Sequence, residues 1–284
     1  AVALVGVVSS ATLARGFVGY FELFLSLPDI LVITVMLLVI CTIAAWGIAQ
    51  SALVAAVATL LEVGGLAMVI YIASDSFALL PDKLDMMLPS VSVQDLSFIG
   101  VGAFLAFYAF IGFEDMVNVA EEVKNPSRTL PIAICLTLIL ATVLYVIISM
   151  VAVLAVPASE LAENSAPLAY IVGSRSASAT VWLSLISLFA VLNGALVQTI
   201  MSTRIMYGMA THGLAPQVLG LVNRHTRTPI VTTCIVVFVV WVFAVALPLA
   251  TLARLTSAIT LVIFAGMNIA LCRIKYEPHE VGVY

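Results

Sequence analysis

Long apolar runs separated by short polar segments dominate this chain. Eight such runs follow one another, at residues 1–14, 30–48, 52–73, 98–119, 130–156, 179–201, 230–247 and 255–272. A helix needs about 20 apolar residues to cross the hydrocarbon core of a bilayer, and most of these runs approach that length. The pattern therefore predicts an all-α polytopic membrane protein with about eight transmembrane helices, surrounded by membrane lipid.

The run at 98–119 is interrupted by charge. Its sequence, FIGVGAFLAFYAFIGFEDMVNV, carries Glu114 and Asp115 shortly after Gly112. Backbone polar groups in hydrocarbon must be satisfied by protein or by a water-filled cavity, and a helix break at that depth marks a binding site in many transporters. We expect one span in two halves, hinged near Ile111 and Gly112.

Composition excludes several classes of protein. Hydrophobic residues make up 63% of the chain and charged residues 9%, with a mean hydropathy of +1.23, whereas about a quarter of the residues in a soluble domain are charged. The net charge of -4 and the lack of a basic cluster exclude a nucleic-acid partner, because such binding needs concentrated positive charge. The chain has no initiator methionine, and we expect a fragment of a longer protein at both ends.

The cysteines and histidines predict no metal and no cofactor. The four cysteines lie in or at the edge of separate apolar runs without a CxxC pair, and the three histidines lack ligand spacing. The cysteines are interpreted as small buried hydrophobic residues.

Basic residues predict the orientation. Lys and Arg gather in the segments 121–129, 204–228 and 273–280, whereas the opposite loops are rich in Asp and Glu. The positive-inside rule places the basic segments on the cytoplasmic side of the cytoplasmic membrane. Segment 213–229, which mixes apolar and basic residues, is either an interfacial segment or a solvated loop.

Several motifs resemble one family of transporters. The segments FYAFIGFED, VNVAEEVKNPSRTLPIAI, LNGALVQTIMSTRIMYGMATHGLAP with a later RTPI, LLEVGGLAMVI and YEPHEVGVY resemble permeases of the amino acid-polyamine-organocation superfamily. The resemblance implies spans three to ten of an expected twelve in a LeuT-type fold of two inverted five-span repeats. Residues 1–74 would end the first repeat, and residues 98–284 would hold the second repeat and the start of the following linker.

The same resemblance implies a substrate site at the broken span. The carbonyls of Tyr108, Ala109 and Ile111 would receive the ammonium of an amino acid, with Gly112 letting the chain leave helical geometry. Tyr108 would act as a gate, and Phe107 would line the site; the alternative is ordinary aromatic packing between helices.

Asn193 is a further candidate for the lining. It lies in the span at 179–201, where a polar amide either faces the substrate route or bonds a neighbouring helix.

Two carboxylates are candidates for gating or coupling. Glu62 lies inside an apolar run before Gly64, and ionisable groups within spans are costly and therefore functional candidates. Glu62 would exchange a proton or bind a cation such as sodium; the alternative is a Glu satisfied by Arg15. Glu114 would gate the site or link it to protons, unless it marks a helix end at the cytoplasmic surface.

These observations predict secondary active transport of amino acids or related amines, as proton-coupled symport. An amino acid exchanger and a non-transporting sensor or inactive truncated permease remain as alternatives. An enzyme is not expected, because the chain has no convincing set of paired catalytic groups. The oligomeric state is left open.

Overall fold

The computed structural model describes residues 2–46, 52–88, 92–113, 116 and 123–276. Helices make up almost all of this part of the chain, and no strand occurs in it. The long helices are α1 (Val2–Phe21), α2 (Asp29–Trp46), α3 (Ala52–Ile72), α5 (Val93–Ala106), α6 (Pro126–Ala155), α9 (Ala177–Thr211), α10 (Ile230–Ala246) and α11 (Leu249–Tyr276). The shorter elements are η1 (Ser74–Leu79), η2 (Phe107–Phe110), η4 (Gln217–Gly220), α4 (Leu80–Met87), α7 (Ala158–Glu163) and α8 (Pro167–Gly173).

The described part of each of the eight apolar runs contains one long helix, which in the run 98–119 is α5 followed by the turn η2. Six of these helices, counting α5 together with η2, are long and apolar enough to cross a membrane. The described part of α3 passes the same test together with η1 and α4, from which it is separated by a bend of 52°. With 17 residues, α10 is slightly shorter. The prediction of an all-α polytopic membrane protein is confirmed.

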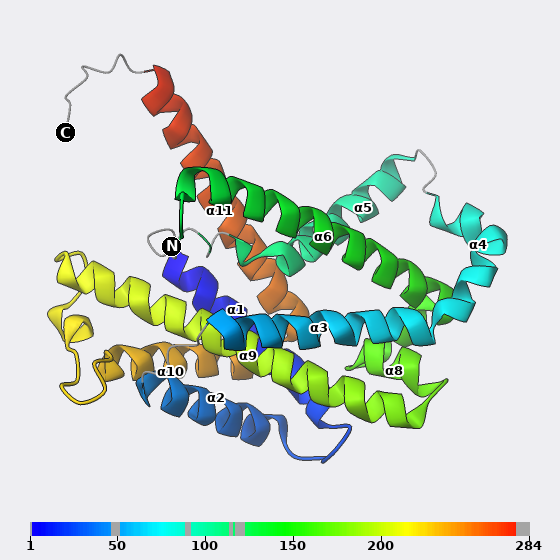
Figure 1. Ribbon diagram of the computed structural model, residues 1–284, viewed down its shortest axis with the longest axis horizontal. Coiled ribbons are helices and arrows are strands. Elements are labelled where there is room, and N and C mark those ends of the chain that lie inside the picture. The colour runs from blue at the N-terminus through cyan, green and yellow to red at the C-terminus, as the bar shows by residue number, and fades with distance from the viewer. Residues whose placement is uncertain (1, 47–51, 89–91, 114–115, 117–122, 277–284) are drawn as a thin grey trace.

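The hydrophobic core lies in one half of the molecule. Its buried side chains come from α1, α2, α9, α10 and the start of α11, and include Val8, Ile33, Ile40, Val240 and Leu252. In Figure 1, α2 and α10 run along one edge of the molecule, while α5 and α6 lie on the opposite side. α5 contains no buried residue, and α6 contains only two. The broken span is therefore attached to a densely packed scaffold instead of lying within it.

Glycine allows α1 to approach its neighbours closely. A Cβ atom at Gly6 would collide with the hydroxyl of Ser202 on α9, and one at Gly19 would collide with the backbone of Ser165. Helices in a membrane associate through such contacts between small residues, because lipid offers no hydrophobic drive to bring them together. The two glycines therefore let α1 pack closely against α9 and against the segment around Ser165.

The first helix extends further than its apolar run suggested. The run ended at residue 14 because Arg15 follows, yet α1 continues to Phe21. Arg15 donates a hydrogen bond of 2.7 Å to Asp29 at the start of α2, and its Nε lies 3.4 Å from the carbonyl oxygen of Leu247. These partners satisfy the guanidinium, so the charge does not end the helix.

Polar contacts join the short helices at the end of the molecule predicted to lie outside. Arg175 bonds both carboxylate oxygens of Asp75, at 3.0 and 3.3 Å, and the hydroxyl of Ser76 at 2.7 Å. Tyr170 donates a 3.0 Å hydrogen bond to Glu160. That bond, and the charge of the same carboxylate, raise the pKa of the Tyr170 phenol. The contacts tie η1 to α8 and α8 to α7.

The expectation of buried cysteines was wrong. Cys41 is half-buried, and Cys135, Cys234 and Cys272 are exposed. Lipid hydrocarbon solvates a thiol about as well as a protein interior does. An apolar environment is therefore available to a cysteine without burial in the protein.

Candidate functional site

The predicted break in the 98–119 span is present. α5 ends at Ala106 and η2 continues to Phe110 as a tighter 3-10 turn. Ile111 then adopts extended geometry with φ -66° and ψ 136°, and Gly112 has φ +122°. A side chain is disfavoured at such a positive φ, so glycine supplies the conformation that ends the helix. The helix break lies at Ile111 and Gly112, where the sequence predicted it. Most of the predicted second half of the span, residues 114–115 and 117–119, lies outside the described residues.

Aromatic rings from two other helices hold the break. Phe107 packs edge-on against Phe264 of α11 with ring centroids 6.4 Å apart, and Phe113 lies 5.7 Å from the same ring. Phe110 contacts Tyr145 of α6 edge-on at 5.2 Å. The predicted lining residue Phe107 thus lies in an aromatic cluster, and this packing restricts how far the broken segment moves relative to α6 and α11.

The carbonyl group of Ala109 in the break accepts a hydrogen bond from a side chain of another helix. The hydroxyl of Tyr145 donates a 2.8 Å hydrogen bond to the carbonyl oxygen of Ala109. The carbonyl oxygen of Tyr108 accepts a 3.2 Å bond from the amide of Ile111. A carbonyl has two lone pairs and retains acceptor capacity after one such bond. Tyr145 was not singled out from the sequence, where its only signal is a phenol in the middle of an otherwise apolar run.

Tyr108 connects the break to α1. Its hydroxyl lies 3.4 Å from the carbonyl oxygen of Ser9 and 3.5 Å from the Ser9 hydroxyl. The neighbouring Ser10 hydroxyl lies 3.3 Å from Thr199 of α9. These buried hydroxyls of α1 were also missed, because Ser and Thr are common in transmembrane helices and their facing is not visible in the sequence. Tyr108 therefore joins the broken span to the scaffold helix α1.

Glu62 and Asn193 lie together. The Asn193 amide donates a 3.4 Å hydrogen bond to the Glu62 carboxyl, which connects α3 to α9. The sequence assigned these residues to different roles, coupling and substrate lining, and the structure brings them into contact. The alternative partner of Glu62 was Arg15, which instead bonds Asp29 and the carbonyl of Leu247.

Comparison with known proteins identifies the family. The sequence profile of the amino acid permease family matches residues 1–282. The chain belongs to the amino acid permease family. Cationic amino acid transporter 3, mitochondrial, of Arabidopsis thaliana is 33% identical over 183 residues, which are 63% of this chain and 30% of that protein. Branched-chain amino acid permease BcaP of Bacillus subtilis is 31% identical over 183 residues, 63% of this chain and 39% of that permease.

A mouse protein is similar over the same extent. Cationic amino acid transporter 4 of Mus musculus is 30% identical over 177 residues, 62% of this chain and 28% of that transporter. The alignments thus span less than two fifths of the length of these relatives. These relatives are named as transporters or permeases, and the chain is a multi-pass membrane protein of the amino acid permease family.

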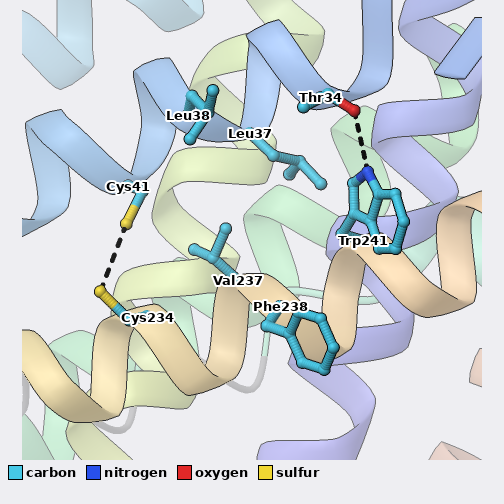
Figure 2. A pocket seen from close by; sticks show the side chains of 8 residues that line it. All are labelled: Thr34, Leu37, Leu38, Cys41, Cys234, Val237, Phe238 and Trp241. Atoms are coloured by element: carbon cyan, nitrogen blue, oxygen red, sulfur yellow. Dashed lines mark hydrogen bonds between the residues drawn. The ribbon is translucent and has the colours of Figure 1, made fainter. Parts of the chain in front are cut away.

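The remaining predicted site residue, Glu114, lies outside the described residues. Within the described part of the chain, His, Cys, Asp and Glu do not gather into a group that would hold a metal ion. Two grooves of about 380 Å³ each adjoin one another between α2 and α10. Figure 2 shows the first, with Leu37, Cys41, Phe238 and Trp241 around it. Neither groove is lined by a residue of the broken span.

Proposed function

We propose that this chain forms part of a secondary transporter that moves amino acids or related amines across a membrane. The observation that carries the proposal is the helix break at Ile111 and Gly112, in a chain of the amino acid permease family. A broken span exposes carbonyl oxygens within the membrane, and these attract the ammonium group that every amino acid carries.

The substrate ammonium binds at the carbonyls of Tyr108, Ala109 and Ile111. Tyr145 orients the Ala109 carbonyl through its 2.8 Å bond, and Tyr108 gates the site from its position against Ser9. The aromatic rings around the break favour the side chain of a neutral amino acid. Among the relatives, the plant and mouse proteins are named as cationic amino acid transporters and the bacterial one as a branched-chain permease, so both classes belong in the test.

Coupling to protons runs through Glu62. A carboxyl group inside a span is costly when charged, so binding and release of a proton there is a means of driving the transport cycle. Asn193 supports this role, because its amide donor stabilises the charged form that follows proton release. Proton-coupled symport is therefore preferred to sodium coupling. In this proposal Glu114 belongs to the gate, and Asn193 also lines the substrate route.

The expected architecture and location accompany this function. Residues 1–74 complete the first inverted repeat and residues 98–284 form the second repeat with the start of the following linker. The basic segments face the cytoplasm, which fits a transporter of the cytoplasmic membrane. An amino acid exchanger is the second candidate, because exchange uses the same broken span without a proton.

Uptake into proteoliposomes tests the proposal. A panel of neutral, branched-chain and cationic amino acids is measured with an inward proton gradient, with an inward sodium gradient and with neither. Glu62→Gln keeps the shape of the side chain and removes its charge; Glu163→Gln, in the exposed end of α7, is the matched control. We expect proton-driven accumulation in the wild type and the control, and its loss in Glu62→Gln.

The other outcomes separate the alternatives. Uptake that depends on neither gradient but requires amino acid inside the vesicle would identify an exchanger. Uptake driven by the sodium gradient would identify sodium, instead of the proton, as the coupling ion. No uptake of any amino acid or amine would sink the transport proposal and favour a sensor or inactive permease.

A further inference from the structure

The two grooves between α2 and α10 form one continuous apolar furrow on the surface of the protein. Both are lined by Leu38 and Cys41, so they are continuous along α2. Leu38 and Phe238 are exposed over 60% and 63% of their surfaces. The first groove contains two polar groups that bond each other, because the indole of Trp241 donates a 2.9 Å bond to the hydroxyl of Thr34. Its free surface is therefore suited to hydrocarbon (Figure 2).

The furrow ends beneath a basic loop. Its second half is lined by Ala45 and Trp46 at the end of α2 and by Thr226 of the loop before α10. Trp46 is 71% exposed, as expected of an aromatic residue at the membrane interface. The loop is held there because the hydroxyl of Thr228 donates a 2.6 Å bond to the carbonyl oxygen of Ala45. The lining of the furrow therefore changes from apolar side chains to the polar groups of the loop at this end.

The loop presents three basic side chains in a defined conformation. The side-chain Oδ1 of Asn223 accepts a 2.8 Å bond from the backbone N–H of His225. The backbone N–H of Asn223 donates a 3.0 Å bond to the carbonyl oxygen of Thr228. Arg227 adopts φ +56°, a left-handed conformation that is rare outside glycine. Arg224, His225 and Arg227 are exposed, and within the described part of the chain their side chains make no ion pair or hydrogen bond. The backbone and the Asn223 side chain order the loop, and its two exposed arginines are available to a ligand from outside the chain.

We propose that the furrow and the loop together bind one anionic phospholipid, with an acyl chain along α2 and α10 and the phosphate at Arg224 and Arg227. The inference is independent of which amino acid the permease carries. An acyl chain fits the apolar lining, and zwitterionic and anionic phospholipids alike have acyl chains, so the loop supplies the selectivity. Guanidinium groups form charge-assisted hydrogen bonds with phosphate oxygens. The predicted orientation places the loop at the cytoplasmic leaflet, where anionic lipids attract basic segments.

Quenching of Trp241 tests the proposal directly. The chain has three tryptophans, and Trp46→Phe with Trp182→Phe leaves Trp241 in the groove as the one reporter. The full chain is reconstituted in dioleoyl phosphatidylcholine with increasing amounts of phosphatidylglycerol brominated in mid-chain. The reverse experiment uses brominated phosphatidylcholine in phosphatidylglycerol. We expect phosphatidylglycerol to occupy the groove at least about fivefold more strongly than its share of the bilayer, since one basic residue contributes about this factor.

Charge variants distinguish the loop from the bilayer as a whole. Arg224→Gln with Arg227→Asn removes both guanidinium groups, and asparagine tolerates the left-handed backbone at 227. Arg254→Gln is the matched control, because Arg254 is an exposed arginine near the start of α11, and the whole of α10 separates it in sequence from the loop. The double variant should be quenched equally by both lipids, and the control should keep the preference.

Three results would overturn the proposal. Quenching that follows the bulk lipid composition would show an ordinary lipid boundary. A preference that survives in the double variant would place the selectivity elsewhere. Absence of quenching by either lipid would show that protein, such as a second copy of the chain, covers the groove.

Discussion

At the scale of single residues, the conformation of Gly112 decides where the span breaks. A Cβ atom there would meet nothing within 4 Å, so a substitution would act through the backbone at φ +122° alone. Gly112→Ala should destabilise the protein by about 1–3 kcal/mol, measured by thermal unfolding in detergent.

The matched control for Gly112→Ala is Gly102→Ala, at a glycine one segment earlier in the same span. Gly102 lies inside α5, and a Cβ atom added to it would also meet nothing within 4 Å. Gly102→Ala should stabilise the protein by up to about 1 kcal/mol, because alanine favours a helix over glycine. Equal effects at the two positions would contradict the assigned hinge.

Tyr145 is the second residue whose role can be isolated. Tyr145→Phe keeps the ring contact with Phe110 and removes the bond to the Ala109 carbonyl. A hydrogen bond of this kind contributes about 1 kcal/mol, so the substrate concentration for half-maximal transport should rise about fivefold. Tyr71→Phe, at a side chain 81% exposed on α3, should change nothing. A loss of stability without any change in substrate affinity would show that the bond from Tyr145 to Ala109 holds α6 to the break and does not orient a substrate-binding carbonyl.

At the scale of elements, the close approach of α1 to α9 depends on Gly6. A Cβ atom at this position would overlap the Ser202 hydroxyl and lie 3.2 Å from the Gln198 carbonyl oxygen. Gly6→Ala should therefore destabilise the scaffold by about 1–3 kcal/mol, as overpacking does. Ser202→Ala should recover part of this loss in the double variant, since the backbone contact persists.

The control for Gly6→Ala is Gly64→Ala in α3, where an added Cβ atom meets nothing within 4 Å. It should be neutral or stabilising. If Ser202→Ala gives no recovery, α1 and α9 do not meet in the arrangement that the structure shows.

At the scale of the whole molecule, the orientation in the membrane follows from charge. A cysteine-free variant carrying either Glu163→Cys or Arg224→Cys tests it, because the two positions lie in loops predicted to be on opposite sides. An impermeant maleimide applied to intact cells should label the first and should label the second only after permeabilisation. The reverse labelling pattern would invert the proposed topology, including the leaflet assigned to the lipid.

The sequence alone determined the approximate extent of the long apolar helices and the position of the break. Both follow from local chemistry, because a helix must be apolar over the thickness of the bilayer and glycine allows the left-handed geometry that ends one. The family motifs likewise lie in contiguous residues, so they are visible without a structure.

Only the tertiary structure decided which faces meet. Membrane spans are apolar on all sides, so hydrophobicity does not distinguish a face in contact with protein from one in contact with lipid. The sequence therefore placed the cysteines in the interior and offered Arg15 as the partner of Glu62, whereas the structure exposes three of the cysteines and pairs Arg15 with Asp29. The contacts of Glu62 with Asn193 and of Tyr145 with Ala109 join residues far apart in the chain, and packing in three dimensions brings them together.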